Sequence, residues 1–401
     1  MNFLSDRIAR LEESATLAMT RMSRELESQG IDVINLSIGE PDFDTPLFIK
    51  EAAKKAIDDN YSHYSPVPGF QELREAICIK LKRDNNLDYK ASQIVASTGA
   101  KQALANAILS LVNPGEEVII PSPYWVSYSE LIKLAEGHAV YVKASIENDF
   151  KITASQLEKA INAKTKLIMF NSPCNPTGSV YTHEELKSIA GVIEANPHVI
   201  VIADEIYEHI NFAGKHESLA SFPAIKDRII LINGVSKGYA MTGWRLGYLA
   251  ANQEIATACN KMQGQITSGT CSISQMAAVQ AMLRDPNEVE EIKIMVEAFR
   301  NRRDLLLGLL KEIPGLKVNL PDGAFYIFPE ANSYFSKKTK EGQCICNADH
   351  LCMYLLRDAH VALVSGEAFG DPNCIRFSYA TSEDRLIEAV KRIRTSLDKL
   401  V

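Results

Sequence analysis

The sequence lacks a run of about 20 apolar residues, the length that a membrane-spanning helix needs. It also lacks an excess of positive charge, because 43 Lys and Arg stand against 50 Asp and Glu, for a net charge of −7. We therefore expect no membrane association and no nucleic-acid partner. The first seven residues do not combine a basic start with an apolar stretch, so no signal peptide is predicted.

Cysteine is sparse, with eight residues scattered along 401 positions. This spacing excludes a dense disulfide framework and favours reduced thiols in a cytoplasmic protein. The tightest group contains Cys344, Cys346, His350 and Cys352. Its C-x-C spacing departs from the usual C-x2-C of zinc sites, so we predict a loop leading into a helix and no metal.

A repeated pattern of strands and helices occupies residues 90–250. Continuous apolar runs lie at 94–96, 118–120, 139–142, 167–170, 199–203, 229–232 and 246–250. Continuous runs are typical of strands buried on both faces of a mainly parallel sheet. Helical patterns lie between or before them, at 10–30, 47–58, 70–83, 102–111 and 184–195. The fold class predicted is α/β.

A long helical pattern at 286–313 separates this region from a different one. The remainder shows strand patterns at 324–328, 361–364 and 374–379, and helical patterns at 347–358 and 382–399. Such a mixture is typical of a small α+β domain. We predict a large domain over 47–290, and a small domain that combines 1–46 with 291–401.

The most informative stretch is 234–247, which follows the apolar run at 229–232. Lys237 lies there, and a lysine at the end of a buried strand is costly unless it has a partner or a chemical role. One such role is a Schiff base to an aldehyde cofactor. Arg245, in the same Gly-rich loop, is suited to holding a phosphate. Together they suggest pyridoxal phosphate; the alternative is a surface lysine and an ion-paired arginine.

Other strand ends carry compatible residues, and ligands of open α/β sheets bind at these ends. Gly99, Ala100 and Lys101 open a helix whose N–H groups suit a phosphate. Trp125 is one of only two tryptophans, and its ring suits stacking on a flat cofactor, although a core aromatic is as good an interpretation.

Two further strand ends carry hydrogen-bonding groups. The amide of Asn175 suits a phenolic oxygen, or else forms a plain Asn-Pro turn. Asp204 suits a pyridinium nitrogen, which makes the ring an electron sink, or else caps a helix. Tyr207, three residues later, is placed to bond the phenolate oxygen of the same ring.

These motifs, taken in order, resemble the class I/II aminotransferases of pyridoxal-phosphate fold type I. The specific stretches are 171–178, 204–207 and 234–247. The N-terminal half is especially similar to bacterial aspartate aminotransferases of the subgroup that includes prephenate aminotransferases, at 39–46, 99–104 and 122–128.

The resemblance implies a role for each motif residue. Lys237 forms the Schiff base and then shuttles the proton, Asp204 pairs with the pyridine nitrogen, and Tyr207 and Asn175 bind the phenolate oxygen. The remaining cofactor ligands are Trp125 at the ring and Ala100, Lys101, Ser236 and Arg245 at the phosphate. Tyr64 resembles a tyrosine that reaches the phosphate of a neighbouring subunit, which implies a homodimer.

The resemblance also implies the substrate contacts. Arg376 grips the α-carboxylate with help from Asn175 and Gly39, and Trp125 also contacts the substrate. Lys101 matches a position that contacts an acidic side chain, which favours aspartate or glutamate and their 2-oxo acids. Ser14 and Thr16 resemble residues that close over the substrate.

Several alternatives stay open at this stage. They are a prephenate, aromatic or alanine aminotransferase, and a fold type I C–S lyase or amino-acid cyclase, which share Lys237, Asp204, Tyr207 and Arg376. A pyridoxal-phosphate-binding regulator is a further class, but its DNA-binding module is not expected in this acidic chain.

Overall fold

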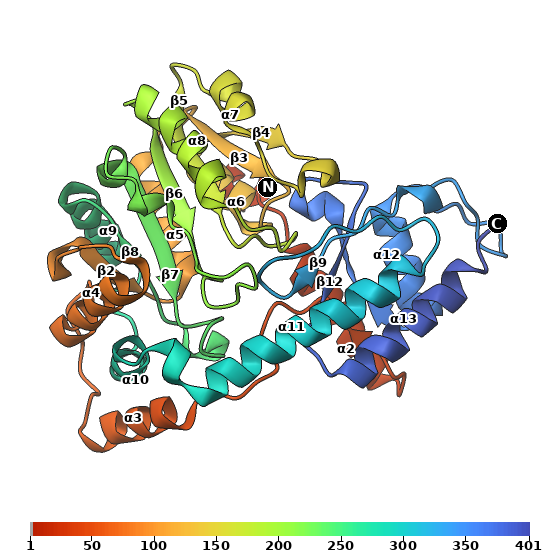
Figure 1. Cartoon of the computed structure of the whole chain (residues 1–401), viewed down its shortest axis with the longest axis horizontal. Coiled ribbons are helices and arrows are strands. Elements are labelled where there is room, and N and C mark those ends of the chain that lie inside the picture. The colour runs from red at the N-terminus through yellow and green to blue at the C-terminus, as the bar shows by residue number, and fades with distance from the viewer. Residues whose placement is uncertain (1–2) are drawn as a thin grey trace.

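The computed structural model of the chain describes residues 3–401. Figure 1 shows a wide part built on a central sheet and a narrower part beside it, with the long helix α11 (Glu290–Lys311) running along both. Among the described residues, every helix is too short or too polar to span a bilayer.

The central sheet has the strand order β2-β8-β7-β6-β5-β3-β4. Only β8 runs antiparallel to its neighbours, so the prediction of a mainly parallel sheet is confirmed. Each predicted apolar run became a strand: β2 (Ile94–Ser97), β3 (Glu117–Ser122), β4 (His138–Lys143), β5 (Thr165–Asn171), β6 (Ile200–Asp204), β7 (Ile229–Gly234) and β8 (Gly247–Ala250).

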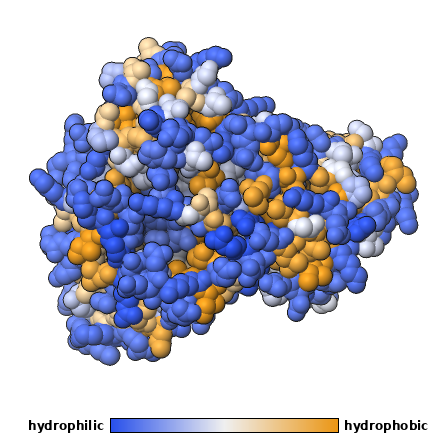
Figure 2. Space-filling view, in the orientation of Figure 1, coloured by the Kyte–Doolittle hydropathy of each residue, from blue (hydrophilic) through white to orange (hydrophobic). Residues whose placement is uncertain are grey.

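Successive residues of these strands pack into different hydrophobic clusters on the two faces of the sheet. In β7, Ile229 and Leu231 join one cluster, whereas Ile230 and Ile232 join the other. This alternation explains the continuous apolar runs, because both faces of each strand are covered. On the face of the molecule that Figure 2 shows, hydrophilic residues dominate and apolar ones form scattered groups.

Helices cover both faces of the sheet. The first cluster receives side chains from α3 (Leu47–Asp58), α4 (Gln71–Asn85), α7 (Ala154–Ala160), α8 (His183–Ala195) and α10 (Ser272–Leu283). The second receives them from α5 (Ala100–Leu111), α6 (Ser127–Leu134) and α9 (Gln253–Ile266). The helix predicted at 184–195 begins with the expected capping box, in which Thr182 and Glu185 satisfy each other's backbone N–H groups.

The sequence patterns missed some helices. The helix predicted at 10–30 begins only at Ala15, as α2 (Ala15–Ser28), and Gly30 follows it at a φ of +84°; a separate short helix, α1 (Asp6–Ala9), was not predicted. No helix was predicted at α9 or α10. Helix α10 packs against both α3 and α4 and buries residues around its circumference, so it lacks the one-sided apolar stripe that reveals a helix.

The narrower part joins the two ends of the chain. Strand β1 (Ile34–Asn35) pairs with β10 (Val361–Ala362), and a second sheet has the order β11-β12-β9. Its strands are β9 (Tyr326–Ile327), β11 (Val364–Ser365) and β12 (Ile375–Ser378), packed with α12 (Ala348–Asp358) and α13 (Glu383–Leu397).

The predicted domain boundaries stay a prediction. The hydrophobic cluster of the narrower part draws on the N-terminal segment and on residues after 290, as the predicted small domain requires. It also includes Tyr207 and three apolar neighbours from the loop after β6, so the two parts are tied together there. Residues 1 and 2, which the small domain was predicted to include, lie outside the described residues.

A buried charge cluster supports the sheet behind that loop. Lys80 of α4 is 1% exposed and its ammonium group contacts the carboxylate of Glu208. Lys80 also donates to Asn85 at 2.9 Å, and Glu208 accepts from Asn85 at 3.0 Å and Asn233 at 2.8 Å. Burial acts to raise the pKa of Glu208, but the positive charge of Lys80, together with smaller effects of His209 and His216, outweighs burial and holds the pKa well below its usual range.

Replacing Lys80 with Met is expected to destabilise the protein by about 3–5 kcal/mol, because the buried carboxylate of Glu208 loses the ammonium group that it contacts. Denaturant unfolding of the two proteins measures this difference. Lys82→Met is the matched control: Lys82 pairs with Asp88 on the surface, so its loss is expected to cost less than about 1 kcal/mol. Equal stabilities of the Lys80 and Lys82 variants would contradict this account.

Candidate active site

A cavity of about 440 Å³ lies at the carboxyl ends of the sheet strands, between the wide and narrow parts. The residues predicted for the site line it together: Ser14, Thr16, Gly39, Ala100, Lys101, Trp125, Asn175, Asp204, Tyr207, Ser236, Lys237, Arg245 and Arg376. They come from segments more than 350 residues apart in sequence. The cavity therefore matches the site that the strand-end motifs predict.

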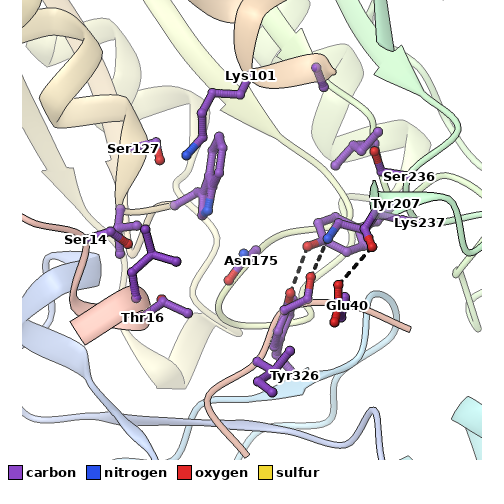
Figure 3. A pocket seen from close by; sticks show the side chains of 18 of the residues that line it. Ser14, Thr16, Glu40, Lys101, Ser127, Asn175, Tyr207, Ser236, Lys237 and Tyr326 are labelled. Atoms are coloured by element: carbon purple, nitrogen blue, oxygen red, sulfur yellow. Dashed lines mark hydrogen bonds between the residues drawn. The ribbon is translucent and has the colours of Figure 1, made fainter. Parts of the chain in front are cut away.

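Lys237 follows β7 and directs its ammonium group into the cavity (Figure 3). Its Nζ donates to the carbonyl of Gly39 and lies 5.9 Å from the ring centre of Tyr207 and 5.7 Å from that of Phe325. Burial lowers the pKa of Lys237 to about 8, against the opposing effect of the Glu40 carboxylate. The neutral amine, which is the nucleophilic form, is therefore accessible near physiological pH.

Asp204 ends strand β6 and is 3% exposed. Tyr128 donates its hydroxyl to Oδ2 at 2.7 Å, and the N–H of Ile206 donates to Oδ1 at 3.2 Å. Burial raises the pKa of Asp204 to about 6. Among residues 3–401 no cation forms a salt bridge with this carboxylate, so the site suits a ligand that carries a proton toward it.

Arg376 lies within β12 and is 1% exposed. Its Nη2 donates to the carbonyl of Ser37 at 2.6 Å and its Nη1 to Oδ1 of Asn175 at 3.0 Å, while Nε has no hydrogen-bond partner. No carboxylate of the described chain forms an ion pair with it. Burial lowers its pKa, and a buried guanidinium without an anion is costly. This arrangement fits a ligand carboxylate, which the planar guanidinium binds through two hydrogen bonds.

The part of the cavity formed by the start of α5 and by Arg245 is suited to a phosphate. Helix α5 begins after Gly99, which has a φ of +80° and offers no side-chain cap to the first N–H groups. A β-carbon at Gly99 would overlap the guanidinium of Arg245, so only glycine lets these groups approach. Arg245 also donates to the carbonyl of Thr242 at 2.9 Å, and Ser236 is buried nearby in the same cavity. Free N–H groups beside an arginine form an anion site.

A second cationic region lies across the cavity from Lys237. Figure 3 shows Lys101, Ser127, Ser14 and Thr16 on one side, with Lys237 on the other. The Nζ of Lys101 lies 5.0 Å from the ring centre of Trp125. Partial burial and the charge of Arg245 lower the pKa of Lys101. In the described chain this ammonium group has no ion-pair partner.

Four lining or supporting residues were missed from the sequence. Arg24 lines the cavity from α2 and, within residues 3–401, forms no ion pair. Glu40, in a stretch quoted for its family resemblance, accepts from Thr242 at 2.9 Å. Tyr128 supports Asp204, and Tyr326 lines the floor of the cavity. Glu40 and Tyr128 lie in the motif stretches 39–46 and 122–128, so a signal for them was present in the sequence. Arg24 and Tyr326 had no such signal, because the patterns at α2 and β9 do not tell which face meets the cavity.

Tyr64 is not brought to this cavity by its own chain, since its side chain is 99% exposed. Its predicted contact with a neighbouring subunit stays a prediction. The cysteine group also behaves as a loop that leads into a helix: the N–H of Cys346 donates to Nδ1 of His350 at 3.4 Å, and Cys352 is buried on α12.

Comparisons with known proteins agree with this geometry. A family model described as aminotransferase class I and II matches residues 31–393. The bifunctional aspartate aminotransferase and glutamate/aspartate-prephenate aminotransferase of Petunia hybrida is 47% identical over 395 residues, which cover 98% of this chain and 82% of that protein. The crystal structure of the aspartate aminotransferase from Rhizobium meliloti matches with a TM-score of 0.95 and 40% identity, covering 100% of both chains.

A further solved structure is that of the aspartate aminotransferase from Thermus thermophilus with maleate. It matches with a TM-score of 0.91 and 37% identity, over 99% of this chain and 100% of that one. The resemblance inferred from the strand-end motifs is thus confirmed across the whole length of the chain. The chain belongs to the aminotransferase class I and II family, whose enzymes have fold type I and depend on pyridoxal 5'-phosphate.

Proposed function

We propose that this enzyme is an aspartate aminotransferase, which moves the amino group of aspartate or glutamate to a 2-oxo acid such as 2-oxoglutarate. The observation that carries the proposal is a pair of cations without a counter-charge in the cavity that also holds Lys237. Arg376 is a buried cation without a counter-charge, and Lys101 is a second unpaired cation across the cavity. A dicarboxylate substrate fits between such sites. The relatives named aspartate aminotransferase, one of them solved with maleate, support this choice.

The residues present fit the cofactor. Asp204 is a buried carboxylate without a cation and suits the ring nitrogen, while Tyr207 and Asn175 suit the phenolate oxygen. Trp125 would face the ring. The phosphate would be held by the first N–H groups of α5, at Ala100 and Lys101, together with Ser236 and Arg245, and Lys237 would bind the aldehyde carbon. When bound, pyridoxal phosphate supplies an electron sink that stabilises negative charge at the substrate Cα.

The protein's own side chains then direct the proton transfers. Arg376 fixes the α-carboxylate and so orients the Cα–H bond. Once the substrate amino group has taken its place on the cofactor, the free amine of Lys237 would take the proton from Cα as a general base and return it to the cofactor carbon that carried the aldehyde, C4′. Release of the oxo acid and entry of a second one reverse the sequence, so the kinetics are ping-pong.

Replacing Lys101 with Ser is expected to lower kcat/KM for aspartate by about 10-fold, the worth of one charge-assisted hydrogen bond at a partly exposed site. Alanine, which has no distal carboxylate, should be used with unchanged efficiency by this variant. Steady-state kinetics with both amino donors measures the difference. Arg24→Ser is the matched control, because Arg24 is a further cation that lines the cavity without an ion pair among the described residues. An unchanged kcat/KM for aspartate in the Lys101 variant would show that this lysine does not contact the side-chain carboxylate of the substrate.

Prephenate is a second candidate acceptor, since the name of the Petunia hybrida relative includes it and it too carries an additional carboxylate. A panel of amino donors against 2-oxoglutarate, oxaloacetate and prephenate separates these activities. Product analysis separates transamination from a C–S lyase: an oxo acid with a new amino acid contrasts with ammonia or a thiol.

We propose in addition a cytoplasmic homodimer. All eight cysteines are free thiols, which suits a reducing compartment. Tyr64 projects from the surface in the single chain, as a residue would that contacts a second subunit. The mass of the purified protein in solution, measured by light scattering, tests the dimer.

A further inference from the structure

Tyr326 lies at the point where the carboxylate site and the cofactor site meet. It belongs to β9, pairs in register with Ser378 of β12 and is fully buried. Its hydroxyl lies 3.0 Å from the hydroxyl of Tyr207, as the dashed line in Figure 3 shows. Its ring lies under the guanidinium of Arg376, with 4.5 Å between that group's central carbon and the ring centre. One side chain therefore contacts both Tyr207 and Arg376.

The number of protons defines the direction of the hydrogen bond between the two tyrosines. Each phenol has a single proton to donate. If Tyr207 gives its proton to the phenolate oxygen of the cofactor, Tyr326 must be the donor between the two hydroxyls. Within residues 3–401 the Tyr326 hydroxyl has no other hydrogen-bond partner, so its proton is available for this purpose. A hydroxyl that accepts one hydrogen bond becomes a stronger donor in the next.

Arg376 influences this donor through the ring. Burial raises the pKa of Tyr326, and the positive charge of Arg376 partly offsets that rise. A substrate carboxylate bound to Arg376 would cancel the charge and make the Tyr326 hydroxyl a weaker donor. Close packing holds the ring in place, because a β-carbon added at Gly39 would lie 2.8 Å from the Tyr326 hydroxyl oxygen.

We propose that Tyr326 is a positioning residue, which directs the Tyr207 hydroxyl toward the cofactor. Through the same hydroxyl, the binding of a carboxylate to Arg376 weakens the hydrogen bond that Tyr207 receives, and we call this coupling the relay. The inference rests on the proposed function, since it requires the cofactor to occupy the cavity. A parallel contact exists, because Arg376 also donates to Asn175. Tyr326 is therefore one of two links, and its loss should reduce the coupling without removing it.

The test uses the full-length Tyr326→Phe variant loaded with pyridoxal phosphate. This change removes the hydroxyl and keeps the ring under Arg376. The absorbance of the bound cofactor is titrated against pH, with and without succinate, a dicarboxylate that lacks an amino group and cannot react. Without succinate, the titration midpoint is expected to rise by about 0.5–1 pH unit, because Tyr207 stabilises the phenolate less well. In the wild-type enzyme we expect succinate to raise this midpoint, and in the variant we expect a smaller rise.

Tyr379→Phe is the matched control. Tyr379 is a buried tyrosine of the same hydrophobic cluster, and its hydroxyl donates to the carbonyl of Ala324 at 3.1 Å without lining the cavity. It should lose similar thermal stability and keep the wild-type titration midpoint. If Tyr326 had only a structural role, the Tyr326→Phe and Tyr379→Phe variants would have the same titration midpoint and the same succinate shift.

The outcomes distinguish this inference from the proposed function. A Tyr326→Phe midpoint and succinate shift equal to those of the wild type would overturn the inference while leaving transamination intact. A wild-type protein that binds no cofactor and transfers no amino group would overturn the proposed function. The wild-type titration alone gives a second test that needs no folded variant: an unchanged midpoint at saturating succinate would also overturn the relay.

Discussion

Replacing Lys237 with Ala is expected to abolish transamination, with kcat lowered by at least about 10⁴-fold. In the proposed mechanism, the Nζ of Lys237 is the amine that binds the cofactor and the base that moves the proton from Cα. In the structure, no other lysine amine accompanies it at the centre of the cavity among the described residues, since Lys101 lies on the opposite side. Steady-state assays with aspartate and 2-oxoglutarate measure the loss.

A second measurement separates chemistry from folding. Borohydride should attach the cofactor covalently to the wild-type chain and leave the Lys237 variant unlabelled. The variant should remain folded, because the substitution removes a buried amine whose pKa the surroundings already depress. Lys261→Ala on the exposed side of α9 is the matched control and should keep full activity. Substantial activity in the Lys237 variant would exclude the proposed mechanism.

Replacing Arg376 with Leu is expected to lower kcat/KM for aspartate by about 30-fold to 4,000-fold, or about 2–5 kcal/mol. The substrate carboxylate would enter a buried site without its cation. Stability should change by no more than about 1–2 kcal/mol, since two lost hydrogen bonds are offset by removing a buried charge that has no counter-ion. Kinetics and denaturant unfolding of the same variant measure both effects.

Comparison with Arg376→Lys tests the geometry of the contact. Lysine keeps the charge and loses the planar pair of donors, so it should recover only part of the lost efficiency. The Lys80→Met variant, by contrast, is expected to lose much more stability than Arg376→Leu. Lys80 already neutralises the buried Glu208 in the free protein, so its removal leaves that carboxylate without this partner. Aspartate kinetics within 3-fold of wild type in Arg376→Leu would show that the carboxylate binds elsewhere.

Much of the wide part was predictable from local patterns. Strands such as β7 are buried on both faces, so their residues form continuous apolar runs with clear ends. Helix α3 was predicted with its observed bounds, 47–58, because its apolar face meets a single partner surface. The motif residues that follow these strands were then predictable as neighbours, since parallel strands end at one edge of the sheet.

The errors have physical causes as well. Helix α10 is buried around its circumference and shows no one-sided pattern. The start of α2 depends on where the N-terminal segment meets the rest of the protein, and residues 10–14 carry no strong stop signal. Tyr326 and Arg24 lie in segments whose orientation toward the cavity depends on packing of the narrow part, so nothing local distinguishes them.

The sequence by itself determined the family and, through the family, the cofactor, and it singled out Lys237 as the predicted reactive lysine, because ordered strand-end motifs encode those properties locally. Only the tertiary structure decided which distant groups meet. It brings Arg376 to the carbonyl of Ser37, 339 residues away, and leaves the guanidinium without an anion. It also sets Tyr326 between Tyr207 and Arg376. Such contacts arise from packing between segments remote in the chain, and residue patterns report burial and period without reporting the partner.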